Sequence, residues 1–215
     1  VFRNSASAFK ALTPELAQSI RDGEDKTDHY EDILGSYLVK LSALQISEAD
    51  SAEAAVLLKV IGDFERISDH CVNLMESAQE LSEKGIQFSD AAKKELDVML
   101  GAVDEVVNLS FQAFTDNDLQ LALQVEPLEQ VIDDLKEQMR KRHILRLQQG
   151  ACSIETGFVW SDILTNLERT SDHCANIAQS ILDGEHHMLH THVSGHANQE
   201  IYNMHYDIFA KEYLQ

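Results

Sequence analysis

Apolar residues recur along almost the whole chain at the three- to four-residue spacing that is typical of α-helices. Thr13 followed by Pro14 predicts the start of a short helix, because a threonine N-cap and a proline in the first turn favour helix initiation. We expect this helix to end at Asp22-Gly23. The next stretch carries an apolar stripe typical of an amphipathic helix: Tyr30, Ile33, Leu34, Tyr37, Leu38, Leu41 and Leu44.

Similar start and stop signals predict five more helices. Ser47 and Ser89 are N-cap candidates, and Gly85 is typical of a helix end. Pro127 should either bend the helix that contains it or mark its true start. Strand signals are nearly absent. The expected ranges are about 47–84, 89–115, 119–147, 154–182, with a stop at Asp183-Gly184, and 197–214.

The sequence repeats itself over a long interval. Residues 63–73 and 166–176 lie 103 positions apart and are identical at seven of eleven positions. Two copies of one unit therefore account for the six main helices. We predict an all-α fold, a six-helix bundle built from two tandem three-helix repeats. The expected division is a leading segment with a short helix over 1–22, a first repeat over 23–117 and a second over 118–215.

The repeated positions are polar rather than core positions. Carboxylates and an amide recur at i, i+4 and i+8, which lie on one helix face: Glu65, Asp69 and Asn73, and again Glu168, Asp172 and Asn176. Two carboxylates one turn apart repel each other unless a cation lies between them. Each preceding helix offers a matching pair, Asp28 with Asp32 and Glu129 with Asp133.

Hairpin geometry places these pairs at the same level. Asp28 and Asp69 are equidistant from the turn near Ser47, and Glu129 and Asp172 are equidistant from Gly150. Each half therefore brings four carboxylates together, which predicts a polynuclear metal site made of hard oxygen ligands. The predicted metal ligands are Asp28, Asp32, Glu65, Asp69, Glu129, Asp133, Glu168 and Asp172.

Three alternatives stay open for these residues. The acidic pairs are also compatible with an ordinary solvated helix face. Arg66 and Arg169 are placed to neutralise neighbouring acids without any metal. His70 and His173 are placed to add a ligand or to orient one.

The net charge of the chain argues against some classes of binding partner. Lys and Arg total 17 and Asp and Glu total 37, so the formal net charge is −20 with neutral histidine. Such a chain repels phosphate backbones and anionic lipids, which argues against nucleic-acid binding, and it attracts cations. The chain has no secretory signal and no run long enough to span a membrane. Three scattered cysteines favour a reducing compartment.

The cysteines, the tryptophan and a histidine-rich stretch can be explained without a role in catalysis. Cys71, Cys174 and Trp160 are expected in the core. The stretch from His186 to His196 holds five histidines and is typical either of zinc ligands or of a polar loop between helices.

The repeated Glu-Arg-x-Ser-Asp-His-x-x-Asn run, in a six-helix chain with a twofold repeat, resembles the PhoU family from about Asp22 to Tyr213. The resemblance implies regulation of phosphate transport rather than catalysis. It also implies multinuclear metal clusters of iron or zinc, with manganese or magnesium as further options, and it carries the ligand role over to the eight carboxylates.

Two contexts fit this resemblance. The start at Val1 and the leading segment favour the cytoplasmic tail of a sodium-dependent phosphate cotransporter. The expected partner is then the transporter membrane domain in the same chain, the expected location is the cytoplasmic face of the membrane, and a homodimer is compatible with it. The alternative is a free-standing PhoU regulator of ABC-type phosphate uptake and its sensor kinase. A carboxylate-bridged di-iron enzyme is a further alternative, but its Glu-x-x-His motif is missing.

Overall fold

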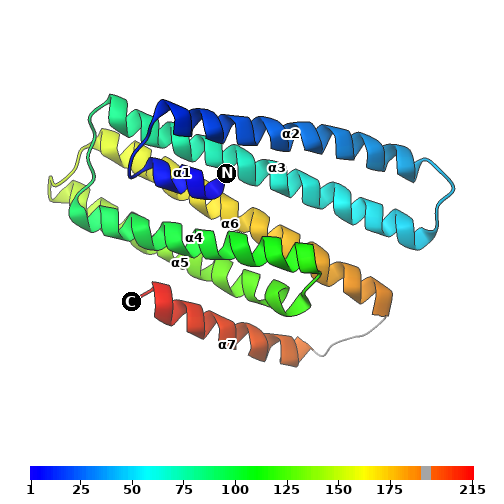
Figure 1. Cartoon of the computed structure of the whole chain (residues 1–215). Coiled ribbons are helices and arrows are strands. Elements are labelled where there is room, and N and C mark those ends of the chain that lie inside the picture. Colours follow the sequence, from blue (N-terminus) through cyan, green and yellow to red (C-terminus); the bar gives the residue numbers. More distant parts are fainter. Residues whose placement is uncertain (190–194) are drawn as a thin grey trace.

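The computed structural model describes residues 1–189 and 195–215, with side chains described outside 185–198, and every regular element in these residues is an α-helix. The prediction of an all-α helical bundle is confirmed (Figure 1). The helices are α1 (Phe2–Ala8), α2 (Pro14–Ser42), α3 (Glu48–Glu83), α4 (Asp90–Asp116), α5 (Leu119–Gln148), α6 (Ile154–Leu189) and α7 (Gly195–Tyr213).

Side-chain caps fix where the long helices begin. The Thr13 hydroxyl accepts a hydrogen bond from the Leu16 amide at 3.1 Å, and Ser47 and Ser89 do the same for α3 and α4. Asp118 accepts from two amides of α5. Gly85 and Gly150 end their helices at positive φ, which a glycine adopts without steric strain. The connections are therefore short, and the helices that they join run antiparallel.

Two predicted helix ends are wrong. Gly23 lies inside α2, which runs unbroken from Pro14 to Ser42, and α6 continues past Gly184 to Leu189. A glycine inside a helix costs only about 1 kcal/mol relative to alanine, and tertiary contacts can offset that cost. At Gly23 the Val1 side chain lies 2.7 Å from where a β-carbon would stand, so any larger residue here would displace Val1.

Pro127 does not mark the start of its helix either. α5 begins at Leu119, and Pro127 is buried inside it. The short helix α1 was not among the predicted elements.

Two long hairpins form the frame of the molecule. One is α2 with α3 and the other is α5 with α6, and they pack against each other through α3 and α6. α4 covers the second hairpin, α7 packs on the outside of α5, and α1 lies on the first hairpin (Figure 1).

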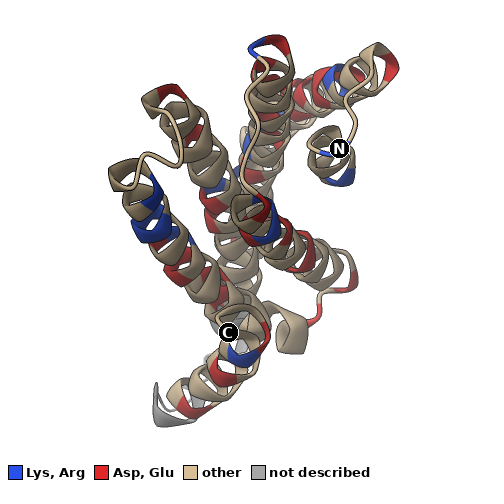
Figure 2. Cartoon of the chain, turned by 90° about the vertical axis from the view of Figure 1, so that its left-hand side faces the viewer, with Lys and Arg blue, Asp and Glu red and all other residues tan. Residues whose placement is uncertain are grey.

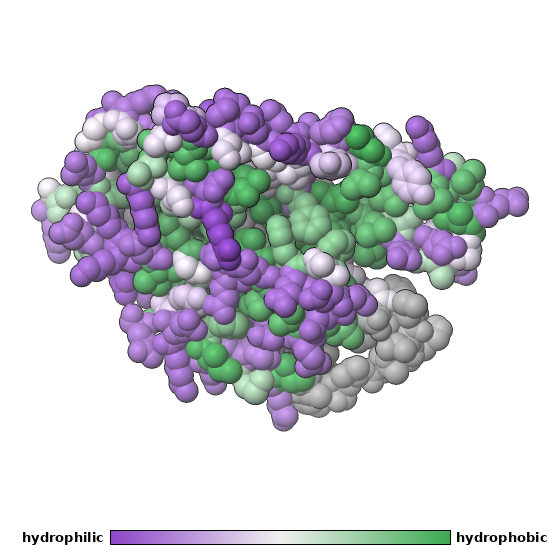
Figure 3. Space-filling model, viewed as in Figure 1, coloured by the Kyte–Doolittle hydropathy of each residue, from purple (hydrophilic) through white to green (hydrophobic). Residues whose placement is uncertain are grey.

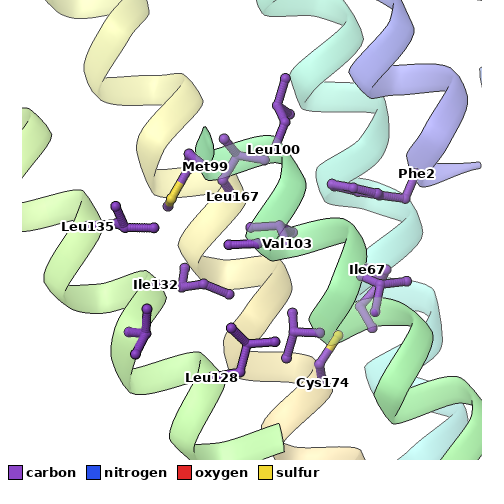
Figure 4. Close-up of a cluster of buried hydrophobic side chains, with 14 of the residues drawn as sticks. Phe2, Ile67, Met99, Leu100, Val103, Leu128, Ile132, Leu135, Leu167 and Cys174 are labelled. Atoms are coloured by element: carbon purple, nitrogen blue, oxygen red, sulfur yellow. The ribbon is translucent and has the colours of Figure 1, made fainter. Parts of the chain in front are cut away.

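The hydrophobic core lies mainly between α4, α5 and α6. Figure 4 shows Met99 and Val103 of α4 facing Leu128 and Ile132 of α5, with Leu167 of α6 beside them. The predicted core positions of Cys71, Cys174 and Trp160 are confirmed, since each is at most 2% exposed.

In the part of the chain that the structure describes, no helix combines the length and the apolar character needed to cross a membrane.

Candidate functional site

The four predicted acids of the second half come together between α5 and α6. Burial raises the pKa of Glu129 to about 7, with added repulsion from Asp133 and Asp172 and a hydrogen bond shared with Asp172. The pKa values of Asp133 and Asp172 are also raised, first by burial and then by the charge of Glu168. Each acid therefore lies close enough to its neighbours for their negative charges to repel one another. We call these four residues the second acidic cluster.

The first half also brings acids together between its two hairpin helices, but a different residue of α2 faces α3. Burial raises the pKa of Glu65, followed by the charge of Asp69 and a hydrogen bond with it. Glu31, not Asp32, is the acid of α2 that acts on Glu65. Asp32 is exposed, because it follows Glu31 by one residue and so points about 100° away around the helix.

Glu24 completes this group of acids. Its pKa is raised by burial and then by Asp25, Asp69 and Asp28. Glu24 and Glu31 were missed in the sequence, although Glu24, Asp28 and Glu31 follow the i, i+4, i+7 spacing of one helix face. The first acidic cluster thus consists of Glu24, Asp28, Glu31, Glu65 and Asp69.

Basic side chains neutralise these clusters only in part. Arg66 lies 3.6 Å from Glu65 and 3.4 Å from Asp69, and Arg169 lies 3.9 Å from both Glu168 and Asp172. Both arginines are largely exposed, so these pairs contribute little. Lys136 forms a closer contact with Glu168, at 3.0 Å. The pKa values of Glu65, Asp133 and Asp172 stay raised in spite of these basic neighbours, because burial and the nearby acids outweigh them.

The acids suit a metal ion in kind, because they are clustered carboxylates and all of them except the exposed Asp28 are partly buried. Among residues 1–184 and 199–215, whose side chains are described, no three Asp, Glu, His or Cys side chains converge on one point as they do around a single ion. Binding an ion at either cluster therefore requires carboxylates to rotate toward a common centre.

The repeated histidines and asparagines form side-chain contacts between the two halves of the molecule. His173 Nδ1 lies 2.9 Å from Asp63 Oδ1, and Asn176 donates to the same oxygen at 3.3 Å. These contacts cross from α6 to α3, so they join the two halves of the molecule.

The same contacts occur in the opposite direction. His70 Nδ1 lies 2.9 Å from Asn166 Oδ1, and Asn73 donates to that oxygen at 3.1 Å. Since these carbonyl and carboxylate oxygens can only accept, each histidine carries its hydrogen on Nδ1. The two imidazole rings stack with centroids 5.6 Å apart. We call these six residues the cross-half clamp: Asp63, His70, Asn73, Asn166, His173 and Asn176.

The histidine-rich stretch from His186 to His196 lies outside the described residues, in part or in its side chains, so its predicted role stays a prediction.

The molecule is therefore a helical bundle with a twofold repeat, and each of its two hairpins carries an acidic cluster. Residues 1–78 and 96–181 match the PhoU domain, and the chain belongs to this family.

Similar proteins carry names from phosphate transport. One relative is the "Phosphate-specific transport system accessory protein PhoU homolog 1" of Thermotoga maritima, 34% identical over 126 residues. That match covers 59% of this chain and only 53% of the relative, about half of its length. A PhoU homolog of Deinococcus radiodurans is 24% identical over 170 residues, with 78% of each chain covered.

Two crystal structures share the fold. PhoU from Pseudomonas aeruginosa gives a TM-score of 0.80 at 23% identity, covering 86% of this chain and 88% of that one. The phosphate transport system regulatory protein PhoU from Streptococcus pneumoniae gives 0.67 at 21% identity, covering 86% and 87%.

The comparisons contradict one prediction about partners. We expected a transporter membrane domain in the same chain, with this domain as its tail. The relatives are instead named as accessory proteins of a transport system, and the matching structures are PhoU proteins.

The cross-half clamp yields a stability prediction. Replacing Asp63 by Ala leaves the mostly buried donor of His173 and the exposed amide of Asn176 without an acceptor, so it should lower the free energy of unfolding by about 1–3 kcal/mol. Asp63→Asn keeps an acceptor oxygen and should cost less. Urea denaturation measures both, with exposed Asp97→Ala as the control. Equal stability of the Ala and Asn variants would show that the clamp bonds contribute nothing.

The raised pKa of Glu129 predicts a pH dependence in the presence of a chelator. Between its ordinary value of 4.5 and about 7, the folded state holds more protons than the unfolded state, so stability should fall as pH rises through this window. The melting temperature of wild type should drop between about pH 5 and pH 8, and Glu129→Gln should flatten this drop. Exposed Glu53→Gln is the control and should leave the slope unchanged.

Proposed function

We propose that this protein regulates phosphate transport as a separate, PhoU-type accessory protein of the cytoplasm, and that metal ions bind its two acidic clusters. The observation that carries the proposal is the pair of clusters at equivalent places on the two hairpins of a PhoU-family chain. The relatives support the transport context through their names.

Carboxylates on two helices would hold each group of ions. In the second half these are Glu129 and Asp133 of α5 with Glu168 and Asp172 of α6. In the first half Glu65 and Asp69 of α3 face the acids of α2, where Asp28 is one of the expected ligands and Asp32 must turn inward to join. Oxygen donors of this kind accept iron, zinc, manganese or magnesium to differing extents.

A bound ion would supply positive charge where acid–acid repulsion is strongest. Figure 2 shows acidic positions along several helices and few basic ones, in agreement with the net charge of −20. Neutralising a cluster removes the repulsion between the two helices of a hairpin. The acids themselves then hold the hairpin together instead of forcing it apart.

The geometry gives no support to a di-iron enzyme. Such bundles draw their ligands from four helices, including a Glu-x-x-His pair on two of them. Here the acids of each cluster come from only two helices, and the clamp uses the Nδ1 atom of the nearest histidine.

Metal retention tests the ligand assignment. Protein purified without added ions should contain iron or zinc by elemental analysis, and Asp69→Ala combined with Asp172→Ala should remove most of it. Chelation should lower the melting temperature of wild type, because an ion at a hundred times its Kd stabilises the folded state by about 2.7 kcal/mol.

The matched control combines Asp97→Ala with Asp183→Ala, which removes the same charge from other surface positions. Metal content that survives the Asp69/Asp172 change, or that falls equally in the control, rules out these ligands.

The regulatory role is tested in cells. Expression of the chain in a bacterium that lacks its own PhoU-type accessory protein should restore the dependence of phosphate uptake on external phosphate. Uptake that stays independent of phosphate, with the protein present and folded, contradicts the proposed role.

A further inference from the structure

The end of the α5/α6 hairpin near Gly150 exposes large apolar side chains. Ile154 and Phe158 of α6 are 73% and 69% exposed, more than any other large hydrophobic residue among residues 1–184 and 199–215. They lie four positions apart, so they share one face of α6. Ile144 of α5 is 45% exposed. Three large apolar side chains therefore meet the solvent at this end of the hairpin.

Helix geometry places these residues on one side of the hairpin. His143 and Gly157 face each other across it, with His143 Nε2 2.8 Å from where a β-carbon on Gly157 would stand. Ile144 and Phe158 each follow by one residue, which in antiparallel helices turns both to the same side. Arg140 lies one turn before Ile144 and is also exposed. We call the following residues the hairpin-end patch: Arg140, Ile144, Ile154 and Phe158.

The opposite side of the hairpin is covered by α4. Glu95 of α4 accepts two hydrogen bonds from Arg146, at 2.9 and 3.0 Å, and lies 3.8 Å from Arg142. Phe88, just before α4, packs against Trp160 with ring centroids 4.9 Å apart. With α4 in place, the visible surface at this end, on the left in Figure 3, is mainly hydrophilic. The covering segment thus combines an acid for the arginines of α5 with an apolar residue for α6.

The last turns of α5 are basic, unlike the rest of the chain. Residues 136–148 hold five Lys and Arg residues and one acid, Glu137, a net charge of +4 in a chain of −20. Figure 2 looks at this end of the molecule and shows basic positions grouped on the end of α5. Arg140 and Lys141 are exposed. Arg140 lies 3.6 Å from Glu137, but such an exposed pair contributes little.

The second acidic cluster is too far away to cancel this local charge. Glu168 is ten residues from Phe158, which is about 15 Å along α6. At physiological salt the screening length is about 8 Å, so charges at that distance are largely screened. A segment that approaches the patch beside α5 therefore meets a positive local charge, whatever the net charge of the chain.

We propose that the hairpin-end patch binds a helix of a partner protein that has apolar residues on one face and Asp or Glu beside them. Its acids would pair with Arg140 and Lys141, as Glu95 pairs with Arg146 on the covered side. Contiguous exposed apolar surface is typical of an interaction site, and aromatic and arginine residues often contribute most of the affinity. The inference stands apart from the metal sites, because no residue of the patch is a proposed ligand.

A protein helix fits this patch better than an anionic membrane does. A membrane is an extended surface, so it would also meet the acidic residues beyond the patch, and the net charge of −20 opposes that contact. A single helix contacts the patch alone.

A synthetic helical peptide provides the probe. It has about five turns, roughly 18 residues, with Leu at the spacing of one face, Glu at the flanking positions and Ala elsewhere. One control peptide has Gln in place of Glu, and the other has Ser in place of Leu. Fluorescence anisotropy should show binding of the acidic peptide and at least tenfold weaker binding of each control.

Variants of the intact chain then locate the site. Phe158→Ser and Arg140→Glu should each weaken binding of the acidic peptide at least tenfold. Leu44→Ser and Lys40→Glu make comparable changes at the end of the other hairpin and should leave the affinity unchanged. All four side chains are exposed, so the fold should survive each change, and circular dichroism checks this.

Three results would overturn the proposal: no binding of the acidic peptide, equal affinity for this peptide and either control peptide, or equal affinity of the patch variants and the control variants. Binding to vesicles of anionic lipid that Phe158→Ser abolishes would assign the patch to a membrane. Self-association that the same change abolishes would assign it to a second copy. Either result would also overturn the proposal.

Discussion

The packing of α3 against α6 is the constraint on which the rest of the structure depends, because it is the main contact between the two hairpins. At its centre lies the cross-half clamp, in which each half supplies the acceptor for the other half's histidine and asparagine. Buried polar groups are costly without partners. A shift of one helix along the other would break all four bonds together, so the clamp selects one register.

The clamp and the acidic clusters share the same turns of helix. On α3, Asp63 stands two residues before Glu65, and His70 follows Asp69 directly. Fixing the clamp face toward the other half therefore turns the carboxylates away from that contact and toward α2. This accounts for four of the seven repeated residues, because Glu65 and Asp69 serve the cluster, His70 and Asn73 serve the clamp, and both depend on the spacing of these residues around the helix.

Helix starts, the twofold repeat and the second acidic cluster could be predicted because each rests on local spacing. Thr13 caps its own helix, and Glu129 meets Asp172 because both are fixed relative to the turn at Gly150. The rest depends on contacts between distant segments. Whether Glu31 or Asp32 faces α3 depends on the rotation of α2 about its own axis, which no pattern within α2 reveals.

The two halves have diverged in ways that give them different properties. The second cluster has Lys136 beside Glu168, and the helices that carry it are covered by α4 and α7. In the first half, α2 presents Glu24, Asp28 and Glu31 toward α3. Repulsion between these acids and those of α3 tends to push the two helices apart. A change of charge at the first cluster therefore acts on the packing of α2 against α3, whereas Lys136 already offsets part of the repulsion at the second cluster.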